Sequence, residues 1–343
     1  MSQNISSAGC FNTSASFSVG TSNETLSGRS YLLSIPSNYS LDTPAPLILS
    51  FHGGGQSPST QLDLDQLTNS DVNEKYLVIY PEAIDEQWQV APNSTSDDVG
   101  FVTDILDDIE STLCIDISQI YATGKSQGGG MAGLLACDET LSTRFAAFAP
   151  VSGAFYIEDA DDCKPASVKI SCSAGRADIP MLEFHGGDDP VVPYDGDDSK
   201  RDACLPAIPH WVQEWAERND LGTTNTSTTI TKSAKLYQFG NGSNLGLVSH
   251  VYDGNSIGHV WPTKKLFADD DDSATASFDA TPMILEFFGN YTLDIDSKNT
   301  SSGGDGNGTD TSGTDDDDSS ASGRKATAIW WLIGFTILQS LII

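Results

Sequence analysis

The sequence predicts an α/β fold in which a mostly parallel β-sheet is covered by helices on both faces. Short, continuous apolar runs alternate along the chain with longer segments of helical character, an alternation typical of parallel strands joined by helices. Continuous rather than alternating apolar runs indicate strands that are buried on both faces. The 343 residues suffice for one large domain of this class or for two small ones.

The first half of the chain supplies the elements on one side of a glycine-rich junction near residue 126. We expect, in order, strands at 31–35 and 46–51, a helix at 61–74, a strand at 76–80 and a helix from 97–98 to about 113. The last helix is predicted from an aspartate cap followed by apolar residues at 3.6-residue spacing.

The second half continues the alternation without an internal repeat. We expect a strand at 120–123, the helix after it, strands at 145–151 and 181–184, a helix at 208–218, strands at 235–239 and 247–252, and a last helix at 276–288. A looping insert that contains Cys163 and Cys172 separates the strands at 145–151 and 181–184.

The junction between the strand at 120–123 and the next helix has the pattern of a nucleophile elbow. Gly124-Lys-Ser126-Gln-Gly128 matches G-x-S-x-G, in which a serine occupies a strained turn between strand and helix. Glycines two positions before and after the serine leave space that Cβ atoms would fill. The motif alone also occurs in ordinary glycine-rich turns, but the flanking strand and helix favour the α/β-hydrolase fold with Ser126 as nucleophile.

A serine nucleophile needs a general base, and in this fold the base is a histidine near the end of the domain. Four histidines follow Ser126. His210 lies in a helix pattern, His250 lies within a strand, and His185 ends a strand, where we expect it to brace the loop. His259 lies in a turn between the last strand and the last helix and is therefore the predicted base.

The carboxylate that orients the base is expected in the loop after the strand at 181–184. This loop contains Asp188 and Asp189, and spacing alone does not choose between them. The aspartates that follow at 195, 197 and 198 are predicted to be turn formers.

Backbone donors are expected to stabilise the negative oxygen of a tetrahedral intermediate. One is the N–H of Gln127 at the helix N-terminus, and the other belongs to Gly53 or Gly54, in the glycine run after the strand at 46–51. The side chain of Gln127 is expected to be incidental.

Trp88 and Trp261 are candidate substrate-binding residues. Packing in the core is the more common role of such side chains.

Composition indicates a secretory route. The net charge of −31 excludes a nucleic-acid partner and electrostatic docking on an anionic membrane. Six cysteines without a C-x-x-C pair predict three disulfides, and we expect Cys114–Cys137 and Cys163–Cys172 among them. Glycosylation sequons begin at Asn4, Asn12, Asn23, Asn38, Asn93, Asn225, Asn241, Asn290, Asn299 and Asn307.

The two ends of the chain carry further expectations. No signal peptide is visible at the start, so we expect the N-terminus to be truncated. The α/β-hydrolase domain is predicted to span 1–293, followed by a disordered stalk rich in Ser, Gly and Asp at 294–325. The hydrophobic tail at 326–343 has no basic residues after it, which favours a GPI attachment signal over a transmembrane anchor. Membrane contact is expected only through this tail.

Several segments resemble secreted fungal feruloyl esterases of the C/D type, a carbohydrate esterase group that includes acetylxylan esterases and is related to polyhydroxybutyrate depolymerases. These segments are 114–130, 147–156, 183–194 and 204–219, and the resemblance extends roughly from 9 to 291. The family motif H-G-x-x-D-x-x-I/V-P-Y places the triad aspartate at Asp189. Its motif G-H-x-W-P places the histidine at His259, and the nucleophile falls on Ser126.

The resemblance implies a secreted serine esterase that hydrolyses feruloyl esters of plant cell-wall polysaccharides, such as arabinoxylan, through an acyl-enzyme. It implies no metal and no organic cofactor, and we expect a monomer. Acetylxylan esterase and polyester depolymerase remain alternatives because loops such as 155–180 determine acyl specificity. An alternative of another class is a non-catalytic cell-surface binding protein.

Overall fold

A computed structural model describes residues 5–12, 17–158, 160, 162–254, 257–265 and 275–295. Its strands are β1 (Gly20–Leu26), β2 (Arg29–Ile35), β3 (Ala45–Phe51), β4 (Leu77–Pro81), β5 (Ile115–Lys125), β6 (Ala147–Val151), β7 (Met181–Gly186), β8 (Asn225–Thr229), β9 (Ala234–Phe239) and β10 (Val248–Asp253). Its α-helices are α1 (Pro58–Asp65), α2 (Asp98–Thr112), α3 (Gln127–Cys137), α4 (Ile208–Arg218) and α5 (Ala280–Gly289). The short 3₁₀ helices are η1 (Ala8–Phe11), η2 (Ile84–Glu86), η3 (Leu141–Thr143), η4 (Lys200–Asp202) and η5 (Gly242–Asn244).

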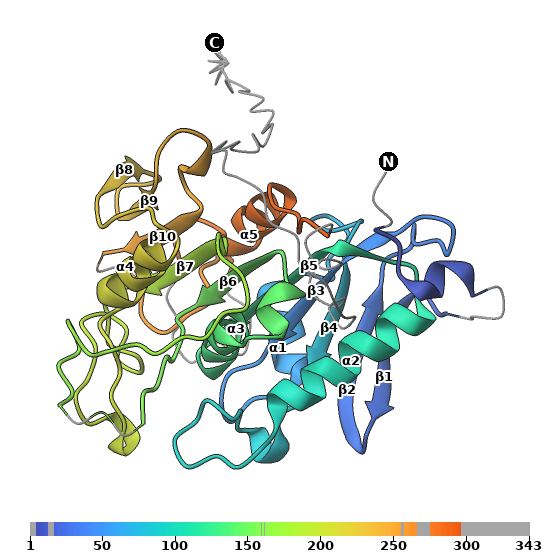
Figure 1. Cartoon of the computed structure of the whole chain (residues 1–343), viewed down its shortest axis with the longest axis horizontal. Coiled ribbons are helices and arrows are strands. Elements are labelled where there is room, and N and C mark those ends of the chain that lie inside the picture. The colour runs from blue at the N-terminus through green and yellow to red at the C-terminus, as the bar shows by residue number, and fades with distance from the viewer. Residues whose placement is uncertain are drawn as a thin grey trace, which may run out of the picture. The chain divides into compact units, whose positions relative to one another are not determined.

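The ten strands form one sheet in the order β1-β2-β4-β3-β5-β6-β7-β10-β9-β8 (Figure 1). Neighbours from β4 through β10 in this order pair in parallel, whereas β1, β2, β9 and β8 add antiparallel edges. The prediction of a mostly parallel sheet is confirmed.

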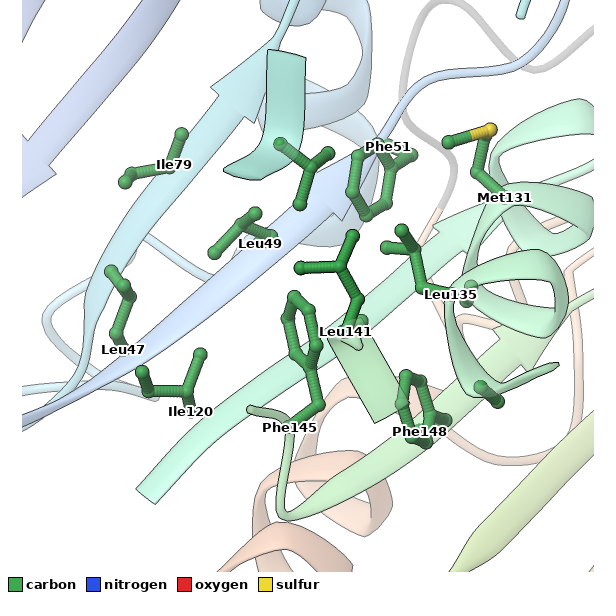
Figure 2. Packing of buried hydrophobic residues seen from close by; sticks show 14 of the residues in the cluster. Leu47, Leu49, Phe51, Ile79, Ile120, Met131, Leu135, Leu141, Phe145 and Phe148 are labelled. Atoms are coloured by element: carbon green, nitrogen blue, oxygen red, sulfur yellow. The ribbon is translucent and has the colours of Figure 1, made fainter. Parts of the chain in front are cut away.

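Side chains of the central strands alternate between two cores on opposite faces of the sheet. Leu47 and Leu49 of β3 belong to a cluster that also includes residues of α2, α3 and α4. Figure 2 shows part of this cluster, with Met131 and Leu135 of α3 beside Phe51 and Phe148.

The second core covers the other face. Ile48 of β3 belongs to this cluster together with Leu64 of α1 and Ile284 and Phe288 of α5. Because successive residues of a strand point to opposite faces, a continuous apolar run is the pattern that this two-sided burial requires. Helices therefore cover both faces, as predicted.

The α2 helix begins where the sequence predicts. The Asp97 side chain accepts a hydrogen bond from the N–H of Gly100 (2.8 Å), which satisfies one of the unpaired donors of the first turn. Phe101, Ile105 and Ile109 are buried in the core, so the predicted apolar stripe faces the sheet.

The α1 helix is shorter than predicted, because it ends at Asp65 rather than near residue 74. Gln66 adopts a left-handed conformation (φ 55°). The Asp65 side chain is fully buried and accepts hydrogen bonds from Ser50 (2.6 Å), Tyr80 (2.9 Å) and the N–H of Leu67 (2.9 Å). These tertiary contacts end the helix, although the following residues are compatible with helix.

Two strands at the ends of the sheet were not predicted. β1 is largely exposed or half-exposed, and every residue of β8 is exposed. An exposed edge strand carries no buried apolar pattern, so it gives no hydrophobic signal in the sequence.

Three disulfides are present, as predicted, but both predicted pairs are wrong. The bonds are Cys10–Cys114, Cys137–Cys172 and Cys163–Cys204. Cys10 reaches Cys114 because the N-terminal segment runs beside the start of β5, where the Ser7 N–H donates to Ile115 (2.9 Å).

The other two bonds also join segments that are distant in sequence. Ile157 pairs with Cys204 in an isolated β-bridge, which brings Cys163 to Cys204. Similarly, the N–H of Ser173 donates to Cys137 (3.1 Å) beside the Cys137–Cys172 bond.

The predicted stalk and hydrophobic tail lie almost entirely outside the described residues, which end at 295. Among the helices that the structure describes, none combines the length and the apolar character needed to cross a bilayer.

The register of the parallel strands gathers the predicted site residues at one edge of the sheet. Phe51 of β3 pairs with Gly124 of β5, so the glycine run after β3 lies beside the elbow. Gly186 of β7 pairs with Asp253 of β10, so the loops that carry the predicted aspartate and histidine leave the sheet side by side. The carboxyl ends of the strands thereby form the candidate site.

Candidate active site

Ser126 lies between β5 and α3 in a strained backbone conformation, with φ 59° and ψ −120°. A non-glycine residue adopts such angles only where its surroundings impose them. The Ser126 N–H donates to Val151 (3.0 Å), and its carbonyl accepts from Gly130 and Ala154 (both 2.9 Å). These contacts hold the serine at the tip of a strand–turn–helix junction.

The glycines of the motif meet the steric requirement that the sequence predicts. A Cβ on Gly124 would lie 2.6 Å from the carbonyl oxygen of Phe51, and a Cβ on Gly128 would lie 2.0 Å from the same atom. Both distances are far below van der Waals contact. The tight junction therefore brings α3 against β3 and turns Ser126 outward.

Asp189 and His259 are in direct contact. The Asp189 Oδ2 lies 2.8 Å from the His259 Nδ1, while the Asp189 Oδ1 accepts from the N–H groups of Val191 (2.8 Å) and Val192 (2.7 Å). The two backbone donors fix the carboxylate and aim its second oxygen at the histidine. Spacing alone did not choose between Asp188 and Asp189, and it is Asp189 whose carboxylate contacts His259.

Ser126 and His259 line the same cavity, which has a volume of about 450 Å³. The Gly53, Gly54 and Gln127 residues also line it. The structure therefore brings together the predicted nucleophile, the predicted base and the predicted oxyanion donors, which come from segments after three different strands, β3, β5 and β10.

The glycine run lies against the elbow. A Cβ on Gly54 would lie 2.3 Å from the Gln127 side chain, and one on Gly53 would lie 3.5 Å from the Ser126 Cβ. The Gly53 N–H donates to the side chain of Gln56 (3.2 Å). The Gly53 N–H therefore already has a partner within the protein.

The Gln127 side chain is not incidental, contrary to the expectation from sequence. Its Oε1 accepts from the N–H of Trp88 (3.2 Å) and its Nε2 donates to Gln87 (2.8 Å). The side chain ties the loop at 87–88 to the elbow. Sequence reasoning missed this role because the partners are about 40 residues away.

Trp88 and Trp261 do not lie beside the cavity. Their exposed fractions are 0% and 1%, and the lining does not include them. The Trp88 Nε1 donates to the carbonyl of His52 (2.7 Å), and the Trp261 Nε1 donates to Thr281 (2.9 Å). Both are packing residues, and the aromatic side chain that lines the cavity is Tyr156, which the sequence did not single out.

His185 braces the aspartate loop, as expected. Its Nδ1 lies 2.9 Å from Glu183 and its Nε2 lies 2.8 Å from the carbonyl of Val192 and 3.4 Å from the Asp189 Oδ2. Both ring nitrogens face oxygen acceptors, so the ring is a protonated imidazolium. Burial disfavours this charge, but Glu183 and Asp189 outweigh burial and raise the pKa of His185 to about 10.

The charges around the aspartate keep it ionised. Burial alone would raise the pKa of Asp189, but hydrogen bonds and charges from His185 and His259 hold it well below its usual range. For His259 the balance is opposite, since burial lowers its pKa below the ordinary value more than Asp189 raises it, and the Lys125 charge lowers it further.

We expect the acid limb of the pH profile of kcat/KM to have its midpoint below pH 6.5. Only neutral His259 accepts a proton, and a lowered pKa keeps the ring neutral to lower pH, so activity is lost as pH falls through that lowered pKa. Rates with an uncharged ester between pH 4 and 9 measure this midpoint. The Lys125→Gln variant should move it upward, and a wild-type midpoint above 6.5 would contradict the assignment.

In the part of the chain that the structure describes, no group of three or more His, Cys, Asp or Glu residues is arranged to hold a metal ion.

The sequence is similar to curated fungal proteins. It is 32% identical over 176 residues to a probable feruloyl esterase C of Aspergillus niger, covering 50% of this chain and 58% of that protein. It is 29% identical over 183 residues to a feruloyl esterase D of Neurospora crassa (50% and 57%) and 28% identical over 221 residues to a feruloyl esterase B of Piromyces equi (61% and 39%). The chain spans little more than half the length of the first of these relatives. The resemblance to feruloyl esterases is confirmed over half of the chain.

No family model matches the chain. Among solved structures, an acetyl xylan esterase from Aspergillus awamori superimposes with a TM-score of 0.53, covering 79% of this chain and 99% of that chain at 14% identity. This likeness concerns the fold, and together with the sheet topology and the elbow it confirms the predicted α/β-hydrolase fold.

Proposed function

We propose that the protein is a serine esterase that hydrolyses carboxylic esters of plant cell-wall polysaccharides. The observation that carries this proposal is the joint placement of Ser126, in its strained elbow, and His259, held by Asp189, on one cavity. A nucleophile, a base and an orienting carboxylate, carried after β5, β10 and β7 at one edge of the sheet, are the parts that acyl transfer requires.

The proposed reaction runs in two halves. Because the Nδ1 of His259 is engaged by Asp189, the Nε2 takes the proton from Ser126 as its oxygen attacks the ester carbonyl. The N–H groups of Gln127 and Gly54 stabilise the negative oxygen. The C–O bond to the alcohol then breaks, His259 returns its proton to the departing oxygen, and an acyl-enzyme remains. Water activated by His259 repeats the sequence, releasing the acid and restoring Ser126.

The names of the relatives support a feruloyl or other hydroxycinnamoyl group as the acyl part. The cavity has a volume of about 450 Å³, and Tyr156 and Val191 are among the residues that line it. Cavities of this size hold small organic ligands. Acetyl and hydroxybutyryl esters are the competing substrates.

Three disulfides support a secreted enzyme, because such bonds persist in oxidising compartments. The GPI signal, the glycosylation and the monomeric state remain predictions from the sequence.

The test is labelling with a fluorophosphonate followed by a panel of methyl ferulate, an aryl acetate and a hydroxybutyrate ester. We expect a covalent adduct on Ser126 and the highest kcat/KM with the feruloyl ester. A protein that neither takes the label nor hydrolyses any ester would instead be a binding protein, and a preference for another acyl group would replace only the substrate part of the proposal.

A further inference from the structure

The charges around the cavity differ in sign from those of the rest of the chain. The whole sequence has 48 acidic and 17 basic residues apart from histidine. The lining of the cavity nevertheless contains Lys125, Lys200 and Arg201 and includes no aspartate or glutamate among the described residues. The charged lysine and arginine side chains in the lining are therefore not offset by a carboxylate within that lining.

Two of these cations are available at the rim. Lys200 is half-exposed and Arg201 exposed, both in η4 of the loop between β7 and α4. Within the described residues neither forms an ion pair, and the Arg201 guanidinium donates only to the neutral Gln87 side chain (3.3 Å). Arg201 therefore keeps donors that a ligand can use.

The third cation lies deeper. Lys125 precedes the nucleophile and is only 4% exposed, and its charge contributes to the lowered pKa of His259. Arg201 likewise acts on the Tyr156 hydroxyl, where its charge opposes the effect of burial on the pKa. Lys125 thus acts on His259, whereas Arg201 acts on Tyr156 in the cavity wall, where Asp197 acts in the opposite direction.

We propose that the substrate of this site carries a carboxylate close to the scissile ester and that Lys200 and Arg201 bind it. The shared chemistry is an anionic ester, with the carboxylate either on the acyl group, as in a half-ester of a dicarboxylic acid, or on the alcohol, as in an acylated uronic acid sugar. This inference rests on the proposed esterase function and adds the charge of its substrate.

Distances decide which charges matter. At physiological ionic strength the Debye length is about 8 Å, so charges near the cavity act on a bound ligand more strongly than distant ones. Lysine and arginine in the wall act at contact distance, where a guanidinium binds a carboxylate through two hydrogen bonds.

The experiment compares matched ester pairs on the full chain. One pair differs on the acyl side, 4-nitrophenyl glutarate against 4-nitrophenyl valerate, and the other on the alcohol side, acetylated methyl glucuronoside against acetylated methyl glucoside. We expect kcat/KM for the anionic member to exceed that of the neutral member by roughly 5- to 30-fold in one pair, mainly through a lower KM. If the anionic ester is preferred in the first pair, the carboxylate belongs to the acyl group, and if it is preferred in the second pair, the carboxylate belongs to the alcohol.

Variants assign the preference to the two residues. Arg201→Gln and Lys200→Gln should each lower the ratio of the two kcat/KM values by roughly 3- to 10-fold, and Arg201→Lys should restore part of it. The matched control is Lys235→Gln on β9, an exposed lysine outside the cavity lining, which makes the same change in net charge. In the Lys235→Gln variant, the ratio of kcat/KM for the anionic ester to kcat/KM for the neutral ester should equal that of the wild type.

The ratio also separates the two proposals. Ratios at or below one in both pairs, or a preference that persists in the double variant of Lys200 and Arg201, overturn the anionic-ester inference while ester hydrolysis itself stands. An absence of hydrolysis for all four esters, together with no fluorophosphonate adduct, overturns the esterase function.

Discussion

Replacing Ser126 with alanine is expected to lower kcat/KM for a 4-nitrophenyl ester by on the order of 10⁴- to 10⁶-fold. The hydroxyl is the proposed nucleophile, and without it only the oxyanion donors and substrate binding remain to accelerate attack by water. Steady-state kinetics at matched protein concentration measure the loss, and the fluorophosphonate adduct should disappear. A residual rate within tenfold of the wild type would show that another group attacks the ester.

Ser126→Gly provides a matched control for folding. Alanine keeps a Cβ at φ 59°, whereas glycine adopts such angles without steric cost. We expect both variants to be equally inactive, with Ser126→Gly more stable than Ser126→Ala by about 1 kcal/mol. Thermal unfolding of the two proteins tests this order, and equal stabilities would show that the elbow is not strained.

Removing the Cys10–Cys114 disulfide is expected to lower the free energy of unfolding by about 4–5 kcal/mol in the chain-entropy account. The bond closes a loop with a sequence separation of 104, and its loss gives the unfolded chain more conformational freedom. The double variant Cys10→Ala, Cys114→Ala compared with the wild type in urea unfolding measures the change.

The Cys137–Cys172 bond provides the comparison, because its sequence separation is only 35. Its removal by alanine is expected to cost about 1 kcal/mol less. The reverse order would mean that native contacts of each bond, rather than the entropy of the unfolded chain, set its contribution.

The elbow and the loop that carries His259 could be predicted from the local sequence. A strand, a G-x-S-x-G turn and a helix of small residues define Ser126 within a dozen residues, and the structure places these elements at β5 and α3. His259 was accessible for a related reason, since it lies in the loop between β10 and α5, and fold order alone points to that loop. These features can be predicted because they depend on residues that are close together in the sequence.

Contacts between distant segments were not readable in this way. The predicted cysteine pairs were wrong. Cys114 bonds Cys10 because the N-terminal segment pairs with β5 through backbone hydrogen bonds, and no pattern of residue types predicts these bonds. The choice between Asp188 and Asp189 was open on spacing, and it depends on which carboxylate the N–H groups of Val191 and Val192 orient toward His259.

By itself, the sequence determined the α/β class, the elbow and the three-disulfide count, because apolar periodicity and turn glycines act over a few residues. Only the tertiary structure decided the buried roles of Trp88 and Trp261, the bracing role of Gln127 and the presence of Lys200 and Arg201 in the cavity wall. The physical reason is that burial, hydrogen-bond partners and local charge depend on which loops meet at the carboxyl edge of the sheet. That meeting is set by strand order and register rather than by adjacent residues.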